Sequence, residues 1–332
     1  MTQWSNRNRG GEGPPAGAAA APTQMSKSSW WGALRGAMRE FGADNLTDLA
    51  AALTYYAILA LFPTLLVLVS LLGLAGPDAT RTLTDNASAV LPSDVAGFVT
   101  TSIENLQENQ GAAGLVGIAS LAVALWSASG YIAAFMRASN VVYDVPEGRP
   151  IWKTLPIRVG VTLLLVVLTT LTVLGVAISG GVAERAGQLL GLGSAAVTVL
   201  DVAKWPVLLF MVVFMLAVLY WASPNAKRGF RWVSPGSVLA VVIWLVASLA
   251  FSFYIANFAS YDRTYGSMAG VVVFLLWLWI SNIAILLGEE FNAEIERGRA
   301  EEAGKPEGEE PYVEMRDRPK KKGRKHREKR RG

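Results

Sequence analysis

Few side chains in this sequence could perform catalysis or bind a metal. The chain has no cysteine and one histidine, His326, so the residue counts exclude a thiolate nucleophile, a cysteine-ligated metal and a multi-histidine metal site. Asp144 and Glu147 lie between apolar segments, but they form no carboxylate cluster of the kind that a metal-dependent nuclease needs. We therefore predict no catalytic residue, no metal site, no cofactor and no enzyme activity.

The remaining candidates are polar and aromatic residues within long apolar stretches. The stretch at residues 51–74, AALTYYAILALFPTLLVLVSLLGL, has no charge but contains Tyr55, Tyr56 and Pro63. Pro63 cannot donate a hydrogen bond to the carbonyl of Leu59, so it is either a hinge or a static kink. The tyrosines either face a partner helix or belong to an aromatic belt at a membrane interface. The candidates for substrate binding or gating are Tyr55, Tyr56, Pro63, Trp126, Arg137, Asn257, Tyr261 and Tyr265.

Other apolar segments carry hydroxyl and amide side chains that either line a cavity or bond to a neighbouring helix. They are Ser127, Ser129, Thr169, Thr170, Ser248, Ser252 and Asn282. The nearest carboxyl groups, Glu289 and Glu290, follow the last apolar segment, where we expect an interface. Ion-coupled transporters often keep a carboxylate at mid-depth, because a charge there is costly and usually functional. Its absence from these segments argues against an ion-coupled pump.

The long apolar segments predict a membrane protein. The chain is 52% hydrophobic and only 17% charged, and uncharged apolar residues concentrate in six blocks at about 49–74, 114–136, 159–180, 205–223, 235–258 and 267–288. A helix of about 24 residues is roughly 36 Å long and crosses a hydrocarbon core of about 30 Å. Helices satisfy their own backbone groups in lipid. We predict an all-α, polytopic membrane helix bundle with six transmembrane helices.

The distribution of lysine and arginine predicts the orientation. Six spans place both termini on one side, and 26 of the 30 basic residues fall on that side. The four on the opposite side are Arg81, Arg185, Lys204 and Arg263. Because cytoplasmic loops carry the excess of basic residues, we expect both termini in the cytoplasm and the bundle in the plasma membrane, which the family resemblance described below implies is a bacterial inner membrane.

The sequence divides into three regions. Residues 1–28 are rich in glycine, proline and alanine and are predicted to be disordered. Residues 29–297 form the membrane domain, beginning with WWGALRGAMREF (30–41), an amphipathic helix that either lies in the inner interface or packs on protein. Trp30, Leu34, Met38 and Phe41 share its apolar face. Residues 298–332 are predicted to be a disordered, charged cytoplasmic tail.

The end of this tail, PKKKGRKHREKRRG (319–332), is strongly basic. It is either a plain topology or solubility tail or a contact for anionic lipid head groups, which attract each basic residue by about 1 kcal/mol. Nucleic acid is a weaker alternative, because no aromatic residues are interleaved for base stacking. The head-group candidates are Lys320, Lys321, Lys322, Arg324, Lys325, Arg330 and Arg331.

An ordered series of motifs resembles the YihY/BrkB family of bacterial inner-membrane proteins. It comprises AALTYYAILALFP, LWSASGYIAAFMRASNVVYDV, LYWASPNAKRGFRWVSPGSVLA and YIANFASYDRTYGSMAGVVVFLLWLWISNIAILLGEEFNAEIE, between about residues 30 and 297. The resemblance implies a six-helix membrane protein with an envelope role, and some members carry the label ribonuclease BN. Two features depart from the family: Asp262-Arg263 replaces a common Asn-Lys pair, and the basic tail is additional.

Together these features predict transport or flipping of a lipid-like or amphipathic envelope substrate. The alternative is a non-transporting scaffold for envelope proteins, and a membrane-tethered ribonuclease is the least supported reading. The expected partners are membrane lipids, a lipid-like substrate and further copies of the chain in a homo-oligomer.

Overall fold

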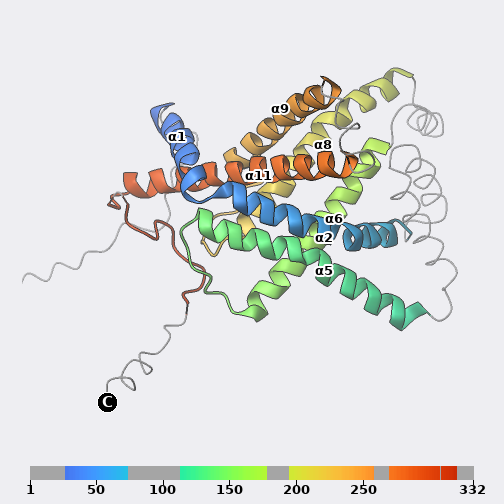
Figure 1. Cartoon of the computed structure of the whole chain (residues 1–332), viewed down its shortest axis with the longest axis horizontal. Helices are drawn as coiled ribbons and strands as arrows, with labels where there is room; N and C mark the ends of the chain where they lie inside the picture. Colours follow the sequence, from blue (N-terminus) through green and yellow to red (C-terminus); the bar gives the residue numbers. More distant parts are fainter. Residues whose placement is uncertain (1–26, 74–112, 178–193, 258–268, 307, 320–332) are drawn as a thin grey trace, which may run out of the picture.

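The computed structural model describes residues 27–73, 113–177, 194–257, 269–306 and 308–319 (Figure 1). This part of the chain contains seven helices and no strand, which confirms the all-α prediction for it. The helices are α1 (Lys27–Ala43), α2 (Leu46–Gly73), α5 (Ala113–Val142), α6 (Ile151–Ala177), α8 (Ser194–Ala222), α9 (Pro235–Asn257) and α11 (Ala269–Glu302).

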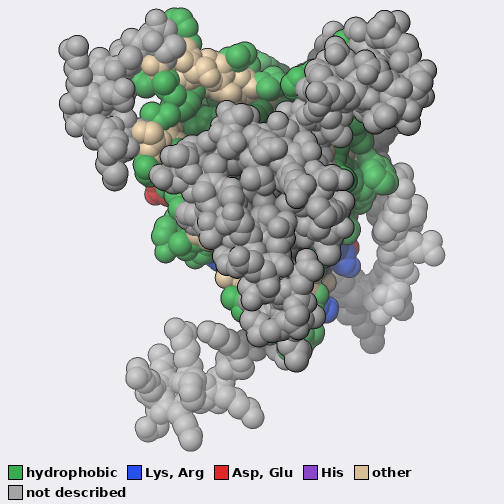
Figure 2. Space-filling model, turned by 90° about the vertical axis from the view of Figure 1, so that its right-hand side faces the viewer, with side chains coloured by type: hydrophobic (Ala, Val, Ile, Leu, Met, Phe, Trp, Pro, Cys, Tyr) green, Lys and Arg blue, Asp and Glu red, His purple; other side chains and the backbone are tan. Residues whose placement is uncertain are grey.

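Four helical segments among the described residues are long and apolar enough to cross a membrane. They are Ile151–Val173, Val202–Ala222, Pro235–Ile255 and Gly270–Glu302, and Leu46–Leu61 is a shorter apolar helix. Their apolar side chains largely face outward, as for Leu249, which is 73% exposed, so the surface suits lipid. Hydrophobic side chains also predominate among the described atoms visible in Figure 2. The count of six spans and the side of the termini remain predictions.

Helix α11 is the central element of the bundle. It packs against α1, α2, α5 and α9, and the pairs α1–α2, α2–α5, α2–α6, α5–α6, α6–α8 and α8–α9 also pack together. Figure 1 shows α11 running beside α2 and α9. At the crossing with α9 a Cβ on Gly236 would lie 1.9 Å from the carbonyl oxygen of Gly288, so small residues permit the backbones to approach.

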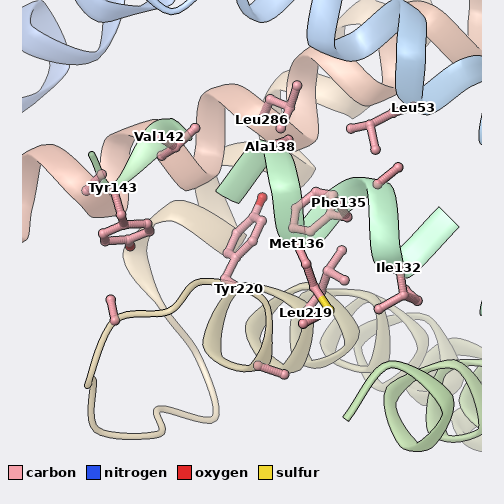
Figure 3. Close-up of a cluster of buried hydrophobic side chains, with 14 of the residues drawn as sticks. Leu53, Ile132, Phe135, Met136, Ala138, Val142, Tyr143, Leu219, Tyr220 and Leu286 are labelled. Carbon is pink, nitrogen blue, oxygen red and sulfur yellow. The ribbon is translucent and has the colours of Figure 1, made fainter. Parts of the chain in front are cut away.

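The core lies where α2, α5, α8 and α11 meet (Figure 3). The ring of Phe135 stacks on that of Tyr220 at 6.3 Å between centroids, and Leu53 and Leu286 are buried beside them. Large aromatic side chains bury much apolar area and add favourable ring–ring contacts. This cluster holds four helices in a fixed arrangement.

Helix α1 packs on α11. Ala33 and Ala37 are buried against Phe291 and Ile295, whereas Met38 is exposed. Packing on protein, one of the two predicted alternatives, is therefore observed for this face. The predicted apolar face is divided, since Trp30 contacts Phe291 while Met38 points away.

The segment after residue 297 differs from the predicted disordered tail. Helix α11 continues to Glu302, and residues 311–318, which we call the C-terminal strap, pack across the end of the bundle. Met315 forms an isolated antiparallel bridge with Ala226, and Tyr312 is buried with its ring 6.4 Å from that of Tyr143. We call this end of the bundle the strap end. Residues 1–26 and 320–332, for which disorder was also predicted, lie outside the described residues.

Candidate functional site

The sequence candidates on α2 face different surroundings. Tyr55 is 59% exposed, whereas Tyr56 packs against the core, and their rings meet edge-on at 5.5 Å. The guanidinium of Arg137 lies 5.3 Å from the centre of the Tyr56 ring. Pro63 is partly buried inside α2.

The other candidates are scattered or lie outside the described residues. Trp126 is exposed on α5, with the guanidinium of Arg158 at 4.7 Å above its ring. Asn257 ends α9, and its side chain is outside the description. The same holds for the whole of Tyr261, Tyr265 and the seven basic tail residues from Lys320 to Arg331. Among the described candidates, Tyr55, Tyr56 and Arg137 lie in contact in series, and a binding or gating role for the set stays a prediction.

A cavity of about 370 Å³ instead lies between α2, α5, α6, α9 and α11. Its volume falls in the range of small-molecule sites, roughly 300–1,000 Å³. Most of its wall is apolar, with Ala57, Ala128, Leu165, Phe274, Trp277 and Leu278 among the lining residues. Such a wall suits an acyl or other hydrocarbon chain.

The cavity has a polar edge near the strap end. The Tyr131 hydroxyl donates to Asn282 Oδ1 at 2.9 Å, and Asn282 Nδ2 donates to Thr54 Oγ1 at 3.2 Å and to the Leu278 carbonyl at 3.0 Å. We call Tyr131, Asn282 and Thr54 the polar edge. Each donor has an acceptor, so the edge is held in one arrangement. Tyr131 and Asn282 of this edge line the cavity, as do the hydroxyl groups of Thr64, Thr162, Thr169 and Ser281, so the largely apolar wall carries a few polar groups.

Sequence reasoning found part of this cavity. Thr169 and Asn282, flagged as polar residues within apolar segments, both line it. Tyr131 was missed as a candidate, although it also lines the cavity. The signal that could have found it is its position within an apolar segment, several turns from either end of α5.

Two buried carboxyl groups lie on α11 between the cavity and the strap end. Glu289 is 0% exposed, and its Oε2 accepts from the Ser139 hydroxyl at 3.0 Å. Among the described residues, Glu289 Oε1 and both oxygens of Glu290 have no hydrogen-bond partner. The sequence placed these groups near an interface after the sixth apolar block, and the structure buries both.

The strap end is organised around Arg149. Its side chain is 1% exposed and pairs with Glu147 at 2.7 Å. It also donates to the carbonyls of Ala222, Ser223 and Pro224, at 3.3, 2.7 and 3.4 Å. Although burial acts in the opposite direction, hydrogen bonds from Arg149 and Asn140 hold the pKa of the Glu147 carboxyl below its usual value. This arginine thus ties residues 143–150 to the end of α8.

No group of three or more histidine, cysteine, aspartate or glutamate side chains is placed to hold a metal ion within the described part of the chain. The organised features there are the apolar cavity and the hydrogen-bonded strap end. Of these two features, the cavity has the volume of a small-molecule site.

Comparison with known proteins places these features in a family context. The family model described as virulence factor BrkB matches residues 37–312. A ribonuclease-like protein, YfkH, of Bacillus subtilis (strain 168) is 31% identical over 247 residues, which cover 74% of this chain and 88% of that protein. A UPF0761 membrane protein of Aggregatibacter aphrophilus (strain NJ8700) is 27% identical, over 79% of this chain and 91% of the relative.

Some relatives are longer. A UPF0761 membrane protein of Azoarcus sp. (strain BH72) is 31% identical over 75% of this chain, but the match spans only 59% of that protein. No solved structure matches this chain.

Proposed function

We propose a transport function for this chain, which belongs to the family described as virulence factor BrkB: it moves or flips a lipid-like or amphipathic substrate of the bacterial envelope. The cavity between α2, α5, α6, α9 and α11 carries the proposal. Its hydrocarbon wall suits an acyl or isoprenoid chain, and its polar edge offers hydroxyl and amide groups to a head group. A scaffold needs no such space inside its bundle.

The proposal includes six membrane spans with both termini in the cytoplasm. Helix α1 packs on α11 near the strap end, and the strap covers the same end, so the two extremes of the described chain lie together. The excess of basic residues in the loops on that side supports a cytoplasmic location.

The orientation can be tested by labelling, because the chain has no cysteine of its own. Gly42→Cys and Glu309→Cys, both at exposed positions, should react with a membrane-impermeant maleimide only after the membrane is permeabilised. Asp262→Cys, in a segment assigned to the outer side, should react in intact cells. Reaction of Gly42→Cys or Glu309→Cys in intact cells contradicts the orientation.

The transport function is tested in proteoliposomes that carry fluorescent phospholipid and isoprenoid-lipid analogues in one leaflet. Ala128→Phe fills the cavity from α5, whereas Ala122→Phe makes the same change at an exposed position of the same helix. We expect movement with the wild type and with Ala122→Phe, and a large loss with Ala128→Phe.

Two results would redirect the interpretation. If no analogue moves or binds, and a stoichiometric protein partner purifies with the chain, the scaffold function replaces transport. If both phenylalanine variants behave alike, the cavity is not the substrate site. We propose that this chain lacks the ribonuclease activity suggested by the name of YfkH, because a single histidine and no cysteine limit the catalytic groups available.

The basic tail is proposed to contact anionic head groups through Lys320, Lys321, Lys322, Arg324, Lys325, Arg330 and Arg331. Each basic residue near such a surface contributes about 1 kcal/mol. Deletion of residues 320–332 retains the strap and should weaken binding of the purified protein to anionic vesicles, without changing transport. Loss of transport in this deletion would contradict a role limited to surface attraction.

A further inference from the structure

Two arginines at the strap end, Arg228 and Arg299, have buried donors that lack acceptors among the described residues, and Arg231 lies beside them. Arg228 and Arg231 lie in the connection between α8 and α9, and Arg299 lies on α11. The side chain of Arg299 is 10% exposed, and one of its nitrogens donates to Glu296 at 3.0 Å. Arg228 Nη1 and Arg299 Nε and Nη2 are buried with no hydrogen-bond partner among the described residues. Leaving a buried donor unsatisfied is costly, so a missing acceptor is the natural explanation.

A small pocket lies beside Arg228, whose Nη1 is one of these donors, and beside Arg231. It has a volume of about 20 Å³ and is lined by Arg228, Gly229, Arg231, Ser234, Asn292 and Glu296, among others. Arg299 adjoins it through its ion pair with Glu296. Burial, together with the nearby positive charge of Arg299, lowers the pKa of Arg231. The charged residues that line the pocket are Arg228, Arg231 and Glu296, and Arg299 adjoins them, so positive charge is in excess there although Glu289 also acts on Arg228.

The size of the pocket restricts what can enter it. A space of about 10–15 Å³ admits one water molecule, so this pocket accommodates one or two oxygen atoms of an anion, and no hydrocarbon chain. The remainder of a larger ligand must lie outside, on the adjoining surface.

That adjoining surface is aromatic. Trp221, Phe230, Trp232 and Phe214 contact one another in series, with centroid distances of 5.4, 5.5 and 5.3 Å from Trp221 to Phe230, Phe230 to Trp232 and Trp232 to Phe214. Trp232 is 65% exposed. Phe210 continues this aromatic patch along α8, stacking on Phe214 at 6.3 Å. Exposed aromatic side chains are typical of the level of lipid head groups, where one part of the ring system meets hydrocarbon and another meets water.

We propose that this pocket binds the phosphate of an anionic phospholipid, with its glycerol and acyl chains lying over the aromatic patch and α8. Guanidinium groups form strong, geometrically specific hydrogen bonds with phosphate oxygens. A phosphate accepts hydrogen bonds and donates none when fully ionised, so it matches the unsatisfied donors. The apolar surface beside the pocket selects a lipid over a free ion. The site is separate from the cavity, in which none of these arginines takes part.

The test is native mass spectrometry of the purified full-length protein, titrated with phosphatidylglycerol or phosphatidylcholine of the same acyl chains. Both lipids contain a phosphodiester, but the choline cation makes the head group of phosphatidylcholine neutral overall, whereas that of phosphatidylglycerol keeps its negative charge. We expect the wild type to retain phosphatidylglycerol about tenfold more tightly, and Arg231→Gln to weaken that binding by about tenfold through loss of charge-assisted hydrogen bonds.

Lys227→Gln is the matched control, because Lys227 adjoins Arg228 in sequence but points to an exposed ion pair with Glu314. It should change binding less than twofold. Arg228→Gln is a second variant, although the guanidinium lies 4.8 Å over the Tyr143 ring and its loss can impair folding, so its melting temperature is measured alongside.

Three outcomes overturn the proposal. Equal weakening by Arg231→Gln and Lys227→Gln would reduce the effect to general electrostatic attraction. Equal retention of the two lipids would remove the anionic selectivity. Displacement of the lipid by inorganic phosphate at equal concentration would assign the pocket to a free anion. None of these outcomes depends on transport, so the proposed function is tested separately.

Discussion

Replacement of Asn225 by alanine should release the C-terminal strap from the bundle. Asn225 is completely buried. Its side-chain nitrogen donates to the carbonyls of Pro146 and Asp317, at 2.9 and 2.8 Å, and its side-chain oxygen accepts from the Asp317 N–H at 3.1 Å. One amide therefore joins the connection after α5, the connection after α8 and the strap.

The expected cost follows from these three hydrogen bonds. Each contributes about 0.5–1.5 kcal/mol net, and an acceptor left unsatisfied in a buried place costs about 1–3 kcal/mol. Pro146 is exposed and Asp317 is partly exposed, so their backbone groups can turn to water, and the cost is chiefly that of the three lost bonds. We expect a loss of about 2–4 kcal/mol in the free energy of unfolding.

The assay combines thermal unfolding in detergent with limited proteolysis of the strap. Lys153→Ala is the control, because Lys153 binds the same strap residue, Asp317, through a 2.6 Å ion pair at an exposed site. Exposed pairs contribute about 0–1 kcal/mol. If Asn225→Ala has the same melting temperature as the wild type and its strap resists protease equally, the reasoning is refuted. If Lys153→Ala has the larger effect, the strap is held by surface charge.

Three further changes test other parts of the structure. Burial first, then Asp144 and Glu40, raises the pKa of Asp44 to about 6, so the folded state binds this proton more tightly than the unfolded state. The contribution of Asp44 to stability is therefore fully present below about pH 4 and is lost as pH rises through about 6. Thermal unfolding of Asp44→Asn between pH 4 and 7.5 should lack this part of the decline. In Gly288→Ala the new Cβ would lie 2.4 Å from the Gly236 carbonyl oxygen, so thermal unfolding should show a loss of about 1–3 kcal/mol, whereas Gly298→Ala, with open space around it, should not destabilise. A lysine at position 149 cannot form the hydrogen bonds that Arg149 makes to three carbonyls and Glu147. Thermal unfolding of Arg149→Lys should therefore show a loss of about 2 kcal/mol or more in the free energy of unfolding.

The helices were largely predictable from the sequence, because apolar character and length are local properties. The block at 235–258 corresponds to α9, Pro235–Asn257, which begins at a proline, a residue well suited to the first helical turn. The block at 267–288 corresponds to α11, which continues to Glu302. Apolar character sets the length of a possible span, but α11 extends beyond it because Phe291 and Ile295 pack on α1.

The cavity was only partly predictable, since its polar edge depends on contacts between distant residues. Adjacent residues on a helix point about 100° apart, so Tyr55 and Tyr56 had to face different surroundings, and they do. Nothing local distinguishes the exposed Tyr55 from Tyr131, whose hydroxyl bonds to Asn282 on another helix. Such a partner becomes visible only when α5 and α11 are placed side by side.

The strap shows why composition misjudges a segment that uses another surface as its core. Residues 311–318 are largely polar and cannot bury a core of their own, which is the property that predicts disorder. In the structure they contribute two apolar anchors, Tyr312 and Met315, while Asn225, Ala226 and Lys227 supply backbone and side-chain partners. Order in this segment is therefore a property of the connection between α8 and α9 as much as of the strap. Because that connection also carries Arg228 and Arg231, release of the strap through Asn225→Ala should disturb the proposed phosphate pocket while leaving the cavity, formed by other helices, in place.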